Sequence, residues 1–389
     1  MFLSRHVWLL AGLIPSLGSA AGTANLGIWE VHESCKAEQP HVQESMDLAI
    51  EMANAAKESL EFLAGAYPSS TSDPAGNLRY KTIHKTVGAL FGLEPSPKEY
   101  GVGEGQIGQI HALYTKMVNV LPSNQNDPVH GYSTRLNSRN LDHQPMLMCS
   151  DKPGENSWQW YGLEDTVPGM GHKMNQHQDF REHGMLNGIE GAWVYEHRFA
   201  WKESEKEEPI LCVEGMLAAV YFDKDIVVFC DALFADPWRS STSPKDLRSS
   251  GISEGDSIMK HSSHIAVVMV HEMSHWFGDR DMYGKPNVDD HTAVTKAGKL
   301  LYLNNGAVEE HSTPPEGEQY KRLKTYGIEK VWNLARAHKT YPDNSGPAKA
   351  ITNADTYSLF ALMMYLDKWD WSSGGTAKVP GTKRKNPPE

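Results

Sequence analysis

The sequence predicts an α+β fold that is rich in helices and carries a small antiparallel sheet. One long stretch, 41–65, places apolar residues at helical spacing among many Ala and Glu residues, which is typical of an amphipathic helix. A second stretch, 219–229, has the pattern of a strand, a short polar turn and another strand. Because so short a turn joins the two strands, they predict an antiparallel hairpin. Further helices are expected over 105–120, 298–310, 318–338 and 353–367.

The first twenty residues have the features of a secretory signal peptide. Arg5 precedes a short apolar run at 7–14, and small residues follow at 18–21. The apolar run is far shorter than the roughly 20 residues that cross a bilayer. We therefore expect residues 1–20 to be removed, the protein to be secreted and extracellular, and one domain to cover 21–372.

Parts of the chain lack the periodicity of helices and strands. Residues 67–80 are punctuated by Ser, Pro, Asp and Gly like a loop. The stretch from about 150 to 211 is rich in Asn, Asp, Gly, His, Pro and Trp, and we expect a loop-rich insertion there. Residues 373–389 are rich in Gly, Pro and Lys and poor in apolar residues, so they are expected to form a disordered tail.

The net charge bears on the class of partner. With 37 basic and 49 acidic residues the formal charge is −12. An acidic surface argues against nucleic acid and against anionic membrane as partners. The charge is otherwise a statement about solubility.

Four cysteines in an exported chain predict two disulfides, for which three pairings are possible. Cys212 and Cys230 flank the predicted hairpin, and this proximity favours their pairing. Cys35 would then pair with Cys149 and tie the amino-terminal helix to the body. Free buried thiols are the alternative for an exported protein.

A helix is expected where an apolar run, 265–270, leads into the most informative motif of the chain. Ser262 or Ser263 can cap its start, and Gly278 suits the left-handed position just after its end. The flanks of the motif are uncharged, as a buried active-site helix requires.

The motif itself is His271-Glu272-Met273-Ser274-His275. At 3.6 residues per turn, His271 and His275 lie one above the other on one face of the helix, where two imidazoles can bind one Zn²⁺. Glu272 points to the side, where it can act as a general base on water. A helix with two core histidines and an unpaired Glu is the structural alternative, but the burial of that Glu would be costly.

A catalytic zinc ion needs a third protein ligand and an open position. The string from His271 to Asp281 fits HExxHxxGxxD, and Asp281 stands where metzincin-type sites place their third ligand. Asp279 is a near alternative. More distant alternatives are Asp289, Asp290, His291, Glu309 and Glu310.

Beyond this motif, the chain resembles the fungal aspzincins, the group of deuterolysin and peptidyl-Lys metalloendopeptidase. The resemblance covers patches of residues 30–370. It rests on the HExxH motif, on Cys35 ahead of an Ala-rich helix, on the strand 226–230 that ends in Cys before Leu233-Phe234, and on Asn353-Ala354-Asp355-Thr356-Tyr357. It implies a zincin-like metalloprotease fold, a zinc cofactor, and a place for Asp355 near the substrate pocket.

The sequence departs from the family pattern at the third ligand. The family carries an Asp three residues before a Tyr-Gly pair. Here Tyr283-Gly284 has Arg280 at that offset and Tyr326-Gly327 has Leu323. Tyr283 is our first candidate for a hydroxyl that donates to the oxyanion, and Tyr326 is the second.

These features predict a secreted zinc metalloendopeptidase in which Glu272 takes a proton from zinc-activated water. The expected partners are protein or peptide substrates, with neither nucleic acid nor membrane, and we expect a monomer. One rival is a metzincin-like protease, which would place a methionine turn beneath the zinc rather than a helix beginning at Asn353. Another rival is a secreted zinc-binding protein or effector without catalysis.

Overall fold

The structure is a computed structural model of the 389-residue chain. It describes residues 22–93, 105–122 and 145–381, apart from gaps at 155, 179, 182–187, 197, 207–210, 223, 279–286 and 338–339. The fold is mixed α+β, as the sequence predicts. In the described chain, no helix is both long enough and apolar enough to cross a membrane.

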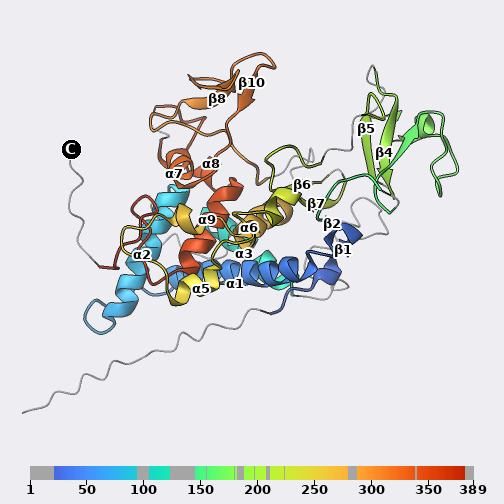
Figure 1. The fold of residues 1–389 in the computed structure, drawn as a ribbon. Coiled ribbons are helices and arrows are strands. Elements are labelled where there is room, and N and C mark those ends of the chain that lie inside the picture. The colour runs from blue at the N-terminus through green and yellow to red at the C-terminus, as the bar shows by residue number, and fades with distance from the viewer. Residues whose placement is uncertain are drawn as a thin grey trace, which may run out of the picture.

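Packed helices form the body of the molecule (Figure 1). The long helix α1 packs against α3, α6 and α9, and α6 and α9 pack against each other. Apolar residues from all of these helices share one core, and every residue of α9 except Asp355 is buried. The bounds are α1 (Gln39–Ala64), α2 (Pro74–Phe91), α3 (Gly105–Val120), α5 (Pro244–Ser249), α6 (Ile265–Phe277), α7 (Ile328–Arg336), α8 (Pro347–Ala350) and α9 (Ala354–Tyr365).

A four-stranded sheet lies beside α6, with strand order β1-β2-β7-β6. Its strands are β1 (Glu30–Val31), β2 (Met146–Met148), β6 (Ala218–Tyr221) and β7 (Ile226–Phe229). The predicted hairpin is present as β6 and β7, which are antiparallel, and β6 forms the edge of the sheet. The sheet as a whole is mixed rather than antiparallel, because β1 and β2 add to β7 in parallel. Strands of two and three residues are too short to show a period in the sequence.

Within the expected loop-rich insertion lies a three-stranded antiparallel sheet, which the sequence analysis does not predict. Its strands are β3 (Gln159–Gly162), β4 (Gly191–Tyr195) and β5 (Arg198–Lys202). Figure 1 shows β4 and β5 set apart from the helices. The buried guanidinium of Arg198 lies 2.6 Å from Glu196 and 3.7 Å from Glu30 of β1, which ties this sheet to the body.

The helix expected over 298–310 is a β-hairpin, so that prediction is wrong. Strand β8 (Leu300–Asn304) pairs with β9 (Ala307–His311) and with β10 (Tyr320–Arg322). Asn305 and Gly306, with φ of 50° and 84°, form the two-residue turn. Two positive φ values in succession are the mark of a type I′ turn, for which Asn-Gly is the preferred sequence.

Helix boundaries differ from expectation at two further places. Helix α2 begins at Pro74, inside the stretch expected to be a loop, and Asp73 caps it by accepting a hydrogen bond from the Gly76 N–H at 2.9 Å. Helix α7 fills only the later part of 318–338, because β10 occupies the start. The helices expected over 41–65, 105–120 and 353–367 are present.

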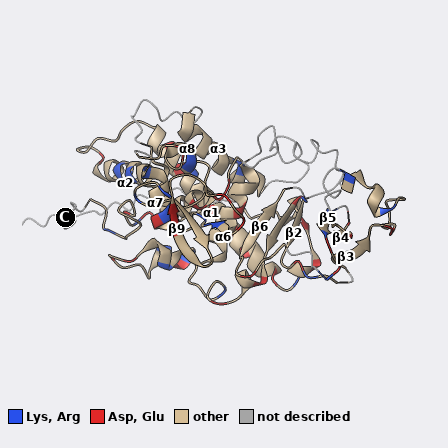
Figure 2. Cartoon of the chain, turned by 90° about the horizontal axis from the view of Figure 1, so that it is seen from above, with Lys and Arg blue, Asp and Glu red and all other residues tan. Residues whose placement is uncertain are grey.

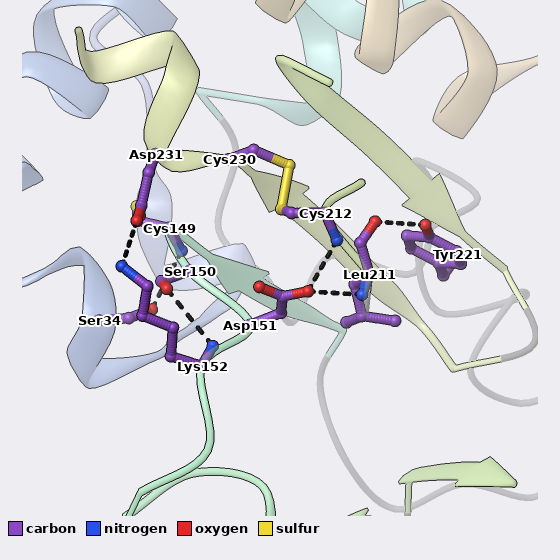
Figure 3. Close-up of a disulfide and its surroundings, with 10 residues drawn as sticks. All are labelled: Ser34, Cys149, Ser150, Asp151, Lys152, Leu211, Cys212, Tyr221, Cys230 and Asp231. Atoms are coloured by element: carbon purple, nitrogen blue, oxygen red, sulfur yellow. Dashed lines mark hydrogen bonds and ion pairs between the residues drawn. A yellow bond between two sulfur atoms is a disulfide. The ribbon is translucent and has the colours of Figure 1, made fainter. Parts of the chain in front are cut away.

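Both predicted disulfides are present, Cys35–Cys149 and Cys212–Cys230. Figure 3 shows the second bond beside Asp151, whose carboxylate accepts hydrogen bonds from the Leu211 and Cys212 N–H groups.

The tail expected to be disordered from residue 373 is ordered up to 381, since Ala377 is fully buried. Residues 382–389 lie outside the described chain. Basic and acidic residues are interspersed along the described chain (Figure 2).

Candidate metal centre

Helix α6 carries the HExxH motif through the core of the molecule. Almost all of its residues are buried. Its N-cap is His264, whose Nδ1 accepts a hydrogen bond from the Ala266 N–H at 3.1 Å. Neither Ser262 nor Ser263 caps the helix, which corrects that expectation. Ser262 instead donates its hydroxyl proton to the Met259 carbonyl.

The end of α6 explains how the chain returns to the motif. Gly278 has a right-handed conformation with φ of −67°, so the expected left-handed turn is absent at this residue. A Cβ at Gly278 would lie 2.6 Å from Cγ2 of Val288 and 2.8 Å from the Ser274 carbonyl oxygen. The glycine is therefore needed for the close approach of the segment around Val288, which brings the next residues beneath the two histidines.

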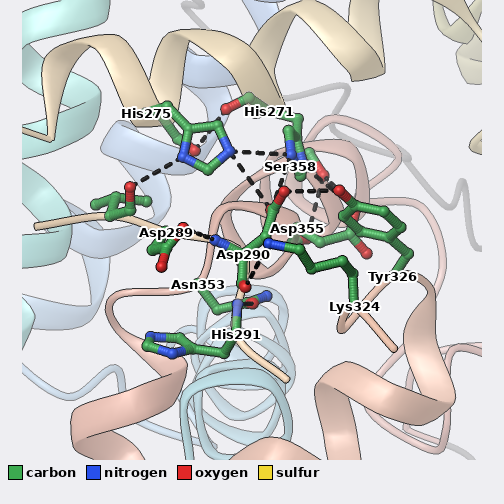
Figure 4. Close-up of polar contacts among 12 residues, drawn as sticks. His271, His275, Asp289, Asp290, His291, Lys324, Tyr326, Asn353, Asp355 and Ser358 are labelled. Carbon is green, nitrogen blue, oxygen red and sulfur yellow. Dashed lines mark hydrogen bonds and ion pairs between the residues drawn. The ribbon is translucent and has the colours of Figure 1, made fainter. Parts of the chain in front are cut away.

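His271, His275 and Asp290 form a cluster of three possible metal ligands. The two Nε2 atoms lie 3.3 Å apart. Oδ1 of Asp290 lies 3.2 Å from Nε2 of His271 and 3.4 Å from Nε2 of His275. Figure 4 shows the carboxylate of Asp290 below the two imidazoles. Two nitrogens and one oxygen thus face a common point.

Asp290 was one of the more distant alternatives for the third ligand. The preferred candidate, Asp281, and its neighbours Asp279 and Tyr283 lie outside the described residues. The remaining alternatives have other contacts, and Asp289 accepts a hydrogen bond from the Asp290 N–H at 2.8 Å. His291 Nε2 is paired with Thr352 Oγ1 at 2.8 Å, Glu309 accepts from Asn304 at 3.0 Å, and Glu310 lies 3.4 Å from Lys299.

The Nδ1 atom of each imidazole lies close to an oxygen atom that can accept its proton. Nδ1 of His275 lies 2.9 Å from the Val288 carbonyl oxygen, to which it can donate its proton. Nδ1 of His271 lies 3.5 Å from Oδ1 of Asp355. Such outer contacts fix the tautomer, so that Nε2 keeps its lone pair for a metal. The other oxygen of Asp355 accepts from the Gly327 N–H at 2.7 Å. Asp355 thus lines the pocket, as the resemblance implies, and also supports His271.

The electrostatics of the cluster favour an ionised carboxylate. Burial alone would raise the pKa of Asp290, but the charges and hydrogen bonds of His271 and His275 outweigh it and hold that pKa far below its usual range. Oδ1 of Asp290 is buried, and when both imidazoles turn unprotonated Nε2 atoms toward it, it has no hydrogen-bond donor among the described residues. A buried anionic oxygen without a donor is costly. A cation bound between it and the imidazoles would remove that cost.

Glu272 lies beside this cluster, in the wall of a pocket of about 690 Å³. The residue is buried, and burial raises the pKa of its carboxyl, while the two histidines act in the opposite direction. A raised pKa brings a carboxylate closer to the range in which it can take up and release a proton near neutral pH. The same pocket is lined by the three cluster residues' side chains.

Two further side chains reach the centre from the segment before α7. The Tyr326 hydroxyl donates to Oδ2 of Asp290 at 2.6 Å, and Lys324 Nζ donates to the Asp290 carbonyl at 3.1 Å. The tyrosine ring is half exposed, but its hydroxyl lies against the buried carboxylate. Burial and the charge of Asp290 raise the pKa of Tyr326, so it remains a proton donor. Tyr326 was the second candidate for this position, and Lys324 was not foreseen.

The described site is therefore a His-His-Asp cluster with a buried carboxylate next to it and a pocket in front. In comparisons with protein-family models, with curated proteins and with solved structures, no match to this chain was found. The chemistry of the site must be argued from its own residues.

Proposed function

We propose that the protein is a secreted zinc metalloendopeptidase whose metal ligands are His271, His275 and Asp290. The observation that carries the proposal is the convergence of these three donor atoms beside Glu272 at the floor of an open pocket. Two disulfides support an exported protein, because disulfides persist in oxidising compartments.

The dimensions of the cluster favour zinc. Ligand atoms ~2.0–2.1 Å from a tetrahedral zinc ion are about 3.3–3.4 Å from each other. The three separations here are 3.2, 3.3 and 3.4 Å. Two imidazole nitrogens and one carboxylate oxygen are also a donor set that zinc accepts, and three protein ligands leave the fourth position for water or substrate.

The roles of the protein groups follow from their positions. Zinc, when bound, supplies a Lewis acid that polarises a peptide carbonyl and makes water more acidic. Glu272 takes the proton from the attacking water and later delivers it to the leaving amine. The Tyr326 hydroxyl can turn from Asp290 to the carbonyl oxygen as negative charge develops there. Asp355 and the Val288 carbonyl keep the imidazoles oriented throughout.

A peptide substrate has a natural place along β6. This strand is at the edge of the sheet, and its residues form one wall of the pocket. An extended peptide can add to an exposed edge through main-chain hydrogen bonds, which accept many sequences. This arrangement suits an endopeptidase better than an enzyme for small molecules.

Among proteases, the helix that follows Asn353 favours an aspzincin-like arrangement over a metzincin-like one. A metzincin-like site would have a methionine turn beneath the zinc instead of this helix. Helix α9 begins at Ala354 with Asn353 as its N-cap, and it packs against α6 beside the cluster.

The test combines metal content with hydrolysis. The purified protein should bind one zinc ion per chain and hydrolyse casein, and a chelator should abolish hydrolysis reversibly. Glu272→Gln should keep the zinc but lose activity by roughly a hundredfold or more, because the ligands remain and the base is removed. A zinc-loaded wild-type protein that cleaves no protein or peptide would contradict the proposal and favour a non-catalytic zinc-binding protein.

A further inference from the structure

Another pocket, of about 410 Å³, adjoins the segment that carries Asp290. We call it the second pocket. Asp289 and His291, the two neighbours of Asp290 in the chain, line it. In Figure 4 the His291 ring lies on the side of Asp290 that faces away from the two imidazoles. The second pocket therefore lies behind the metal centre, and its volume is within the range of small-molecule sites.

Three parts of the chain form the walls of the second pocket. They are the segment 287–292, the segment 343–352 that contains α8, and strands β8 and β10. Arg322 of β10 lies directly opposite Tyr302 of β8, and residues opposite each other in an antiparallel pair share a face of the sheet. Leu300, two residues before Tyr302, shares that face too. An arginine and two apolar side chains therefore reach the pocket from one face of the sheet.

Four charged side chains of the described chain line the second pocket, two of each sign, and none of them pairs with another. Arg322, Lys349 and Asp343 make no side-chain hydrogen bond or ion pair with any described residue. Asp289 accepts one hydrogen bond, from the Asp290 N–H at 2.8 Å, through one oxygen of its carboxylate. Two positive and two negative groups are thus left for a ligand.

Other polar groups of the second pocket have partners within the fold. Nε2 of His291 lies 2.8 Å from Oγ1 of Thr352, and that hydroxyl donates to the Ala348 carbonyl at 3.0 Å. The Asn344 amide donates to the Ser312 carbonyl at 2.9 Å. The choice of ligand therefore depends mainly on the four charges. A ligand with charge of one sign would be repelled by two of these groups, whereas a ligand with both signs can pair with all four.

We propose that the second pocket binds a small zwitterion with a terminal ammonium and a terminal carboxylate group, namely a free dipeptide. Arg322 and Lys349 donate to its carboxylate, for which the planar guanidinium is well suited, and Asp343 and Asp289 accept from its ammonium group. A side chain of the dipeptide packs against the apolar residues of β8. This site does not depend on the metal centre or on the proposed function. A peptidase releases fragments with these two end groups, so the second pocket offers a place for its smallest products.

The experiment measures the affinity of the zinc-loaded protein for the dipeptide Ala-Phe by NMR titration. We expect a Kd of roughly 1 mM or lower. Two analogues each lack one charge, since the acetylated dipeptide has no ammonium group and the dipeptide amide has no carboxylate. Each analogue should bind roughly tenfold more weakly, because it loses hydrogen bonds to charged groups.

Two variants locate the binding site. Arg322→Gln should weaken the binding of Ala-Phe roughly tenfold but leave the affinity for the amide unchanged, since the amide has no carboxylate for the guanidinium to bind. Asp343→Asn should likewise weaken the binding of Ala-Phe and leave the affinity for the acetylated form unchanged. Both side chains are exposed, so both variants should fold. The matched controls are Lys321→Gln and Asp367→Asn, which change the same charges at exposed positions outside the second pocket.

Loss of affinity in both pocket variants and in neither control, each with its own analogue unaffected, would support the assignment. Absence of binding by wild type at roughly 10 mM Ala-Phe would overturn it. Wild-type affinity in both pocket variants would also overturn it, because the dipeptide would then be bound elsewhere, for example at the metal centre. Casein hydrolysis by the pocket variants should equal that of wild type, so either negative result leaves the proposed peptidase intact.

Discussion

At the scale of single residues, the ligand set of the candidate metal centre depends on which acidic side chain lies beside the two histidines. His271 and His275 are found by their spacing alone, because a helix brings residues four apart to the same face. The third ligand depends on the path of the chain after the helix. Asp290 follows His275 by fifteen residues, and its position depends on the contact of Val288 with Gly278. No local pattern in the sequence encodes that contact.

The assignment of Asp290 gives a direct prediction. Asp290→Ala should weaken zinc binding by roughly tenfold or more, on the order of 1.4 kcal/mol, because it removes one of three ligands and leaves two imidazoles. Asp281→Ala should change zinc affinity much less. A competitive chelator titration of both variants measures the difference. Loss of zinc by Asp281→Ala together with retention by Asp290→Ala would restore the ligand set that the HExxHxxGxxD string suggests.

Tyr326 and Asp355 show how far site residues can be predicted from the sequence. The Asn353–Tyr357 stretch identified Asp355 as a site residue, but its contact with His271 depends on the packing of α9 against α6. Tyr326, the second candidate for the oxyanion donor, lies 51 residues after His275 in the sequence. Distance along the chain is a weak guide once a hairpin, β8 and β9, intervenes and returns the chain to the site.

At the scale of secondary structure elements, strong periodicity and length decided which predictions are correct. Helix α1 and the buried α9 are long enough to show their period. Strands β1 and β2 are too short, and they are paired only through tertiary contacts. The β8–β9 hairpin was mistaken for a helix although Asn305-Gly306 is a strong turn signal. That signal was available in the sequence and outweighs the apolar spacing around it.

Helix α6 gives a prediction about pH, because its N-cap is titratable. Burial lowers the pKa of His264 to about 4, from 6.5. Protonation of Nδ1 also removes the acceptor for the Ala266 N–H. Between these two pKa values the unfolded chain binds more protons than the folded chain, so stability falls as the pH falls through this window. At pH 5 the loss relative to pH 7.5 should be about 2 kcal/mol.

The matched variant is His264→Asn, since Asn is a good N-cap and does not titrate. Urea unfolding of both proteins at the two pH values, with a chelator present to remove the contribution of metal, gives the difference. Wild type should lose more stability than the variant on acidification. Equal losses in the two proteins would show that His264 does not carry this pH dependence.

At the scale of the whole molecule, disulfides and backbone hydrogen bonds connect segments that are far apart in the sequence, including those that line the pocket. The Cys35–Cys149 disulfide joins the start of the chain to the central sheet, and Cys212–Cys230 fastens the pocket rim to β7. The sequence predicted both bonds because Cys212 and Cys230 flank the predicted hairpin, which left Cys35 to pair with Cys149. It did not predict the ordering of the chain after residue 372, since Gly, Pro and Lys residues there give no periodic signal.

The segment 373–381 forms backbone hydrogen bonds with the chain at and just before η7 (Ile258–His261). This short helix carries Met259, which lines the pocket. The Ala377 N–H donates to the Asp256 carbonyl at 2.8 Å, and its own carbonyl accepts from the Gly255 N–H at 2.9 Å. The Ile258 N–H donates to the Gly375 carbonyl at 2.7 Å. Ala377, Ile258 and Gly375 are buried, so the loss of these bonds would leave several polar groups without partners.

A chain truncated after residue 372 should therefore be destabilised by roughly 2 kcal/mol or more, at about 1 kcal/mol for each lost backbone hydrogen bond, and its pocket wall at Met259 should loosen. A chain truncated after residue 381 keeps every one of these bonds and should unfold like the full chain. Urea unfolding at saturating zinc compares the two truncations, and the KM for a peptide substrate should rise only in the shorter one. If both truncated chains match the full chain in stability and KM, residues 373–381 are dispensable and the disordered tail expected from the sequence begins where it was predicted.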